Sequence, residues 1–266
     1  MLSIYYEYEI IISCPARKSG SRTRKQASIG NTGTSQATAE APAFFPGRPR
    51  RKADVMKLTI FGASGATGTC LVRQALDAGH EVTAVVRDPA RLSVPAQRRL
   101  HVITADVMDP ASLSPALADA DAVITAIAPH GTGPSTLRQD STRSIIQAMG
   151  KTGARRLLFI SGSIVADEGE SPYLRYLIKP VARHTFLRHA NADFLATERE
   201  IRASDLDWTI FRPPSLTNKP ARGTYRVAAD RNLPRCFSIT RSDLAACVLS
   251  ALDDPAAIHR HICAAN

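Results

Sequence analysis

Short apolar runs alternate with amphipathic stretches along most of the chain after residue 56. The runs are rich in Val, Ile and Leu, as strands buried in a parallel sheet are. Six of them predict strands, at residues 58–62, 81–86, 100–105, 121–128, 155–161 and 207–213. Between them, apolar positions spaced three and four apart predict helices, at residues 67–78, 110–118, 137–149 and 186–203.

This regular alternation of strand and helix indicates an α/β fold with a doubly wound parallel sheet. Two shorter β-like pieces follow, GTYRVA at 223–228 and CFSIT at 236–240, and a last helix is predicted at 241–252. We therefore expect a single domain that spans residues 56–266.

Residues 1–55 have a different composition. The stretch 13–55 is rich in Ser, Thr, Gly, Pro, Arg and Lys and has no apolar period, so it cannot bury enough surface to offset its ordering entropy. We expect 1–55 to be a disordered basic extension. Met56 stands directly before the first strand, and our hypothesis is that it is the native start of the protein.

Charge and cysteine content narrow the possible partners. Nine basic and four acidic residues fall in 1–55, which is half of the net charge of +10, so a nucleic-acid interface would depend on the extension; a solvated tail is the preferred interpretation. No run reaches the ~18 apolar residues of a membrane span. The five cysteines lack C-x-x-C spacing, as is typical of thiols in a reducing compartment. We expect a cytoplasmic protein without membrane or nucleic-acid partners, and we find no metal-ligand pattern.

The most specific motif lies between the first predicted strand and the first predicted helix. It places glycines at positions 62, 65 and 68, interleaved with three small residues; together these candidate cofactor contacts are Gly62, Ser64, Gly65, Ala66, Thr67 and Gly68. Glycines in such a turn permit a tight bend, a close backbone approach to a diphosphate and close helix–strand packing. The helix N-terminus then presents N–H groups to phosphates, so the motif predicts a Rossmann-type dinucleotide site.

The end of the second strand predicts which dinucleotide is bound. An acid there would accept hydrogen bonds from a ribose 2′-hydroxyl, but this chain has Arg87, with Arg91 one turn later. A guanidinium suits a 2′-phosphate. Although Asp88 is adjacent, we expect NADP(H) to be preferred over NAD(H).

Together these segments resemble a known group. KLTIFGASGATG, VVRDPARL, the Asp106–Val107 step and the RPP after the sixth strand look like the atypical short-chain dehydrogenase/reductases. Within that group the chain is similar to the NmrA-like and flavin reductase (biliverdin-IXβ reductase)-like branch, over nearly all of residues 57–253.

The resemblance implies further cofactor contacts. It would place Asp106 and Val107 beside the adenine, and Ala126, Ile127 and Ala128 along the ribose and diphosphate. The segments expected near the nicotinamide and the substrate are Ser161, Gly162 and Ser163 after the fifth strand, and Pro213, Pro214, Ser215 and Leu216 after the sixth.

Two departures from the family pattern bear on the chemistry. A Tyr-x-x-x-Lys pair is absent, since Tyr173 is followed four residues later by Leu177 and Tyr176 by Pro180. Ser215 stands where flavin reductase-type relatives often have His, which argues against biliverdin-like substrates.

The candidate catalytic residues are Ser163, Tyr173 and Ser215. For Ser163 a contact to substrate or carboxamide and a capping role are both open. Tyr173 either covers the pocket or serves packing. Glu198 either pairs with Arg202 at i,i+4 spacing or faces the cleft.

Two functions remain compatible with these residues. The first is an NADPH-dependent oxidoreductase that transfers hydride to a small-molecule acceptor, namely a flavin, a quinone or a similar conjugated compound, which can take its proton from solvent. The second is a non-catalytic NADP(H)-binding redox sensor of the NmrA type, which would act through a protein partner.

Overall fold

The computed structural model describes residues 55–266 except 130, 132, 170 and 186. The expected disordered extension, residues 1–55, lies outside the described residues apart from Val55, and the Met56 start stays a hypothesis. In the described part of the chain, no helix is long and apolar enough to cross a membrane.

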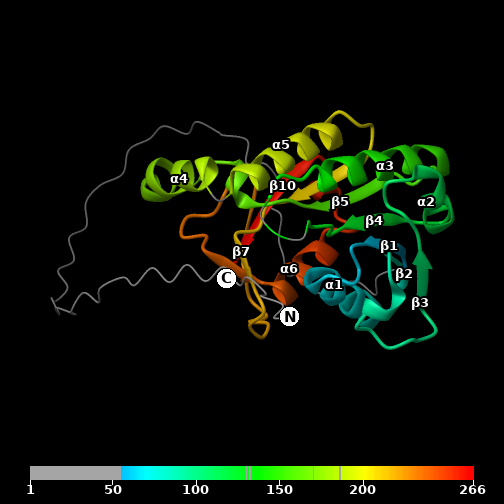
Figure 1. The fold of residues 1–266 in the computed structure, drawn as a ribbon. Coiled ribbons are helices and arrows are strands. Elements are labelled where there is room, and N and C mark those ends of the chain that lie inside the picture. The colour runs from blue at the N-terminus through cyan, green and yellow to red at the C-terminus, as the bar shows by residue number, and fades with distance from the viewer. Residues whose placement is uncertain (1–54, 130, 132, 170, 186) are drawn as a thin grey trace, which may run out of the picture. The chain divides into compact units, whose positions relative to one another are not determined.

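An eight-stranded sheet forms the centre of the described domain (Figure 1). Its strand order is β3-β2-β1-β4-β5-β6-β10-β8, and neighbours pair in parallel except β8, which is antiparallel to β10. The strands are β1 (Lys57–Phe61), β2 (Glu81–Val86), β3 (Leu100–Thr104), β4 (Ala122–Thr125), β5 (Arg156–Ile160), β6 (Asp207–Phe211), β8 (Arg226–Ala229) and β10 (Arg260–Ala265). The expected doubly wound parallel fold is confirmed.

Helices cover both faces of this sheet. Figure 1 shows α2 (Pro110–Leu117), α3 (Leu137–Thr152) and α5 (Arg188–Arg202) along one side, and α1 (Ala66–Asp77) with α6 (Arg241–Ser250) along the other. Strand side chains alternate between two apolar cores: Leu58 and Ile60 face α1 and α6, whereas Phe61 packs on the opposite side. This alternation follows because successive side chains of a strand point to opposite faces of the sheet.

Some elements differ from the sequence-based expectation. β4 ends at Thr125, so residues 126–128 follow the strand instead of completing it. The helix predicted at 186–203 is α5 alone; a π-helical segment η3 (Leu174–Ile178) and α4 (Lys179–His184) precede it. The CFSIT piece yields β9 (Ser238–Thr240), which pairs with the unpredicted β7 (Ser215–Thr217) in a small separate sheet.

Strand β10 was not predicted, although it joins the main sheet beside β6. Half of the apolar residues in its sequence RHICAA are alanine, which has a low β propensity. Its position is decided by pairing with β6 and β8. Such distant contacts leave no periodic signal in the segment itself.

The turn between β1 and α1 has little space for side chains. Gly62 has φ +73°, and a Cβ there would lie 2.8 Å from the carbonyl carbon of Ala126. A Cβ on Gly68 would lie 2.1 Å from the Gly62 oxygen and 2.8 Å from the Ala63 Cα. Both obstacles are backbone atoms, which cannot move aside. The tight turn predicted for Gly62 and the close helix–strand packing predicted for Gly68 are therefore confirmed.

We predict that Gly68→Ala lowers the free energy of unfolding by about 2–3 kcal/mol, because the new methyl overlaps backbone. The matched control is Gly150→Ala in the last turn of α3, where a Cβ meets nothing within 4 Å. That change should raise stability by up to about 1 kcal/mol through helix propensity. Urea unfolding of the two variants measures both values, and equal shifts would refute the close-packing argument.

Candidate functional site

The glycine turn leaves the carboxyl end of β1 and opens α1. Gly65 and Ala66 are exposed, whereas Ser64 and Thr67 are partly exposed. The first helical hydrogen bond is donated by Thr69 N–H to Gly65 O at 2.8 Å, and Gly65 provides no side-chain cap. The N–H groups of residues 66–68 therefore precede that bond at the positive end of the helix dipole. A surface that is free of side chains and rich in donors fits the diphosphate of a dinucleotide.

Residues 126–128 lie beside this turn. Ala126 N–H donates to Phe61 O at 3.0 Å, and Gly62 packs against the Ala126 carbonyl. Ala126 and Ile127 are partly buried and Ala128 is exposed. The structure therefore brings together the glycine turn and the segment expected to follow the ribose and diphosphate.

The residues expected at the adenine end follow β2 and β3, which are neighbours in the sheet. Arg87 and Arg91 are exposed. Asp88 caps the 3₁₀ turn η1 (Pro89–Arg91), where its Oδ1 accepts the Ala90 N–H at 3.0 Å. That contact assigns the Asp88 carboxylate a local structural role. After β3, Asp106 Oδ1 accepts the Met108 N–H at 2.9 Å and Val107 is partly buried.

The segments expected near the nicotinamide are joined to each other by their backbones. Ser161 N–H donates to Phe211 O at 2.7 Å, and Ser163 N–H donates to Pro213 O at 2.8 Å. A Cβ on Gly162 would meet the Phe194 ring at 3.2 Å. The ends of β5 and β6 therefore form one continuous wall.

Behind this wall, Lys179 supports the turn that begins at Ser163. The lysine is buried, and its ammonium donates to the carbonyl oxygens of Ser163 and Ala166. Asn232 Nδ2 donates to the same two oxygens at 3.2 and 2.9 Å. The two carbonyls lie 16 and 13 residues before Lys179 in the chain, so no local sequence pattern predicts these contacts.

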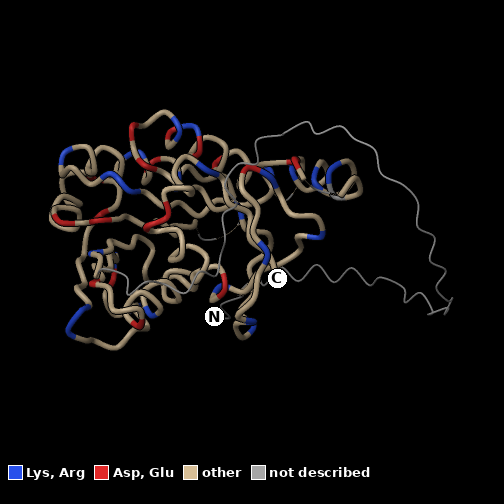
Figure 2. Tube along the Cα trace, turned by 180° about the vertical axis from the view of Figure 1, so that it is seen from behind, with Lys and Arg blue, Asp and Glu red and all other residues tan. Residues whose placement is uncertain are grey.

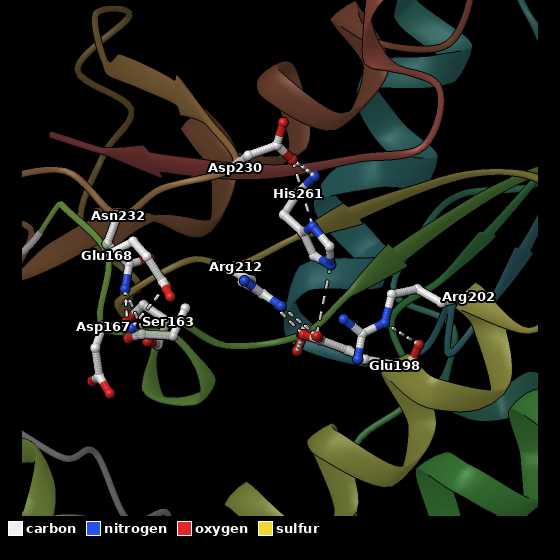
Figure 3. Close-up of polar contacts among 11 residues, drawn as sticks. Ser163, Asp167, Glu168, Glu198, Arg202, Arg212, Asp230, Asn232 and His261 are labelled. Atoms are coloured by element: carbon white, nitrogen blue, oxygen red, sulfur yellow. Dashed lines mark hydrogen bonds and ion pairs between the residues drawn. The ribbon is translucent and has the colours of Figure 1, made fainter.

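A buried ion pair fixes α5 to the same wall (Figure 3). The carboxylate of Glu198 has no exposed surface; it accepts Ser161 Oγ at 2.7 Å and the Arg212 guanidinium at 3.1 and 2.6 Å. The i,i+4 side-chain pairing was wrong, because Arg202 Nε donates to the Glu198 carbonyl oxygen at 3.2 Å. Removal of one partner of such a pair leaves a buried charge that costs about 3–5 kcal/mol.

A cavity of about 340 Å³ lies against this ion pair. Its lining comes from the segment after Ser163, from α5, from Arg212 and from the β8–β10 edge: Val165, Ala166, Asp167, Glu168, Leu195, Glu198, Arg202, Arg212, Asp230 and His261. Burial, with a contribution from Arg212, lowers the pKa of His261, although Glu198 and Asp230 oppose the shift. The imidazole therefore favours its neutral form near pH 7.

None of the three candidate catalytic residues lines this cavity. Tyr173 is 55% exposed just before η3, and Ser215 is exposed in β7. Ser163 lies two residues before Val165, where the lining segment begins, and its role stays a prediction. Arg212 and His261 were missed; a charged residue between an apolar strand and Pro213 is the signal that identifies Arg212. Among the described residues, no three His, Cys, Asp or Glu side chains form a metal site.

The comparisons with known proteins agree with this geometry. The NAD(P)H-binding family model matches residues 62–255. The uncharacterized sugar epimerase YhfK of Bacillus subtilis is 30% identical over 210 residues, which is 75% of this chain and 89% of that relative. The photosystem II assembly factor Ycf39 of Synechocystis is 29% identical over 142 residues; they cover 52% of this chain and 43% of that relative's length.

Solved structures show the same fold. A short-chain dehydrogenase/reductase of Veillonella parvula, solved in complex with NADP, superposes with a TM-score of 0.66 at 18% identity. The match covers 79% of this chain and 94% of that one. From the family model, the glycine turn and the strand order together, the chain belongs to the NAD(P)H-binding family of Rossmann-fold proteins, as its resemblance to the atypical short-chain dehydrogenase/reductases implied.

Proposed function

We propose that this protein is an NADPH-dependent oxidoreductase that reduces a small conjugated acceptor, of the flavin or quinone type. The observation that carries the proposal is the glycine turn. A Cβ on Gly62 or Gly68 would lie 2.1–2.8 Å from backbone atoms, so the turn accepts no side chain at either position. The exposed start of α1 offers N–H groups to a diphosphate. The membership in an NAD(P)H-binding family supports a redox role.

Preference for NADP(H) rests on the end of β2. Arg87 and Arg91 are both exposed after β2. The Asp88 carboxylate between them accepts the Ala90 N–H as the cap of η1. Two guanidinium groups would pair with a ribose 2′-phosphate, whereas the Asp88 carboxylate that would compete for them is held by the Ala90 N–H. The structural neighbour from Veillonella parvula, solved with NADP, is compatible with this preference.

Bound NADPH would supply a hydride, and one proton from water completes the reduction of the acceptor. The chain's own residues would bind and orient the cofactor. The glycine turn would hold the diphosphate, and the wall from Ser161 to Ser163 and Pro213, which backbone hydrogen bonds join, would limit the nicotinamide end. Lys179 and Asn232 hold the turn after Ser163 from behind, and Glu198 holds Ser161 and Arg212. A flavin or quinone requires no Tyr/Lys acid, so the missing pair is compatible with this chemistry.

A redox sensor is the second candidate, and one observation favours it. Four large apolar side chains are exposed on the helical segment that contains η3 and α4: Tyr173, Tyr176, Leu177 and Val181, each more than half exposed. Contiguous apolar surface of this kind marks binding sites for other proteins. In that case NADP(H) binding would occur without turnover.

We expect the full-length chain to bind NADPH and to oxidise it steadily when FMN or duroquinone is supplied. Fluorescence titration with NADPH, NADP⁺ and NADH measures binding, and the decrease in absorbance at the NADPH band measures turnover. Binding without turnover on either acceptor would favour the sensor. Absence of binding to all three nucleotides would contradict the proposed function itself.

We predict that Arg87→Asp weakens NADPH binding about tenfold to a hundredfold, because a charge-assisted contact of about 1.5–3 kcal/mol is lost. NADH binding should remain within about twofold, since NADH has no 2′-phosphate. The control is Lys151→Asp, which makes the same charge change. Lys151 is exposed in the last turn of α3, just before the chain enters β5 at the amino ends of the strands. Equal losses for NADPH and NADH would show that Arg87 does not read the 2′-phosphate.

A further inference from the structure

No residue of the proposed nicotinamide wall itself lines the cavity of about 340 Å³, but the lining contains chain neighbours of both wall segments. Val165 and Ala166 follow Ser163 closely in the chain, and Arg212 directly precedes Pro213. Ligand pockets range from about 300 to 1,000 Å³, so this cavity is at the small end. The size and position suit a one-ring or two-ring acceptor better than FMN, which adds a ribityl phosphate to three fused rings.

The acidic side chains around the cavity are mostly compensated. Glu198 is held by Arg212 at 2.6 Å, Asp230 by Arg260 at 2.6 Å and Asp167 by Arg183 at 2.8 Å. Glu168 is exposed, and its carboxylate accepts the Asp167 N–H at 3.3 Å. Three of the four carboxylates that line the cavity are therefore paired with a guanidinium group. Of these arginines, Arg212 also lines the cavity, whereas Arg260 and Arg183 do not.

Arg202 differs from the other basic side chains of the cavity. Among the described residues it has no carboxylate partner within ion-pair distance, and its Nε alone is bound, to the Glu198 carbonyl oxygen at 3.2 Å. Its terminal N–H groups remain available as donors at the cavity wall. Figure 3 shows Arg202 beside Glu198. A guanidinium with such donors binds a carbonyl oxygen and gains strength when that oxygen becomes negative.

We propose that this cavity is the acceptor site, that it takes a small quinone, and that Arg202 binds one quinone carbonyl oxygen. The inference rests on the proposed function. Two-electron reduction adds one hydride, from the nicotinamide, and one proton, from water, to the quinone and yields the hydroquinone. Arg202 stabilises the oxyanion that precedes protonation, and in this way it takes over the electrophilic role that a Tyr/Lys pair has in typical short-chain dehydrogenases.

Binding can be measured without any turnover through Trp208, the one tryptophan of the chain. Its ring lies 5.3 Å from the ring of His261, which lines the cavity. Duroquinone, whose ring carries no position open to thiol addition, should quench Trp208 fluorescence saturably in the full-length protein. Arg202→Gln should raise the dissociation constant about tenfold, since a hydrogen bond to a charged group is lost.

The matched control is Arg199→Gln on the same helix: Arg199 and Arg202 are both exposed, but Arg199 does not line the cavity, so its change should leave quenching unchanged. Arg202→Lys keeps the charge without the forked donors and should fall between the two. Unsaturable quenching, or equal constants for Arg202→Gln and Arg199→Gln, would overturn the proposed acceptor site. Because NADPH binding is measured separately, these failures are distinct from a failure of the proposed function, which would appear as absent nucleotide binding in the unaltered chain.

Discussion

The close approach of α1 to the end of β1 is the constraint on which the arrangement of β1, α1 and β4 depends. Gly62 touches the backbone after β4 and Gly68 touches the backbone after β1, so one turn fixes a helix and two central strands relative to one another. The N-terminus of α1 is thereby aimed across the carboxyl edge of the sheet. Its donors are backbone N–H groups, which carry no titratable charge, so this end of the helix suits an anion without requiring a basic side chain.

Helix α5 is held to the ends of β5 and β6 by a buried ion pair instead of close backbone packing. Glu198 reaches from α5 to Ser161 after β5 and to Arg212 after β6. An ion pair without solvent exposure is a weak source of net stability, because its desolvation offsets much of its attraction. Its directional hydrogen bonds nevertheless specify one relative position for α5 and the two strand ends. Lys179 and Asn232 act similarly on the turn that begins at Ser163.

This contrast explains what could be predicted from the sequence. The glycine turn and the strand–helix alternation are local patterns, and both lie where they were expected. The arginines after β2 are also a local pattern, and their contact with a 2′-phosphate stays a prediction. The partners of Glu198 are 37 and 14 residues away, and those of Lys179 are 16 and 13. Side-chain pairing of this kind has no period or spacing, so helix geometry alone suggested Arg202 as the partner of Glu198. β10 was missed for the same reason, since its neighbours in the sheet decide its conformation.

The electrostatics of the cavity depend on His261 staying neutral. Its ring nitrogens lie 3.8 Å from Glu198 Oε2 and 3.6 Å from Asp230 Oδ1, which is too far for good hydrogen bonds. Burial and the charges of Arg212 and Arg202 lower its pKa. A protonated ring would compete with Arg212 for Glu198 and would loosen the link between α5 and β6. With the ring neutral, Glu198 stays committed to Arg212 and Ser161, and Arg202 is left as the cation that a ligand in the cavity would meet.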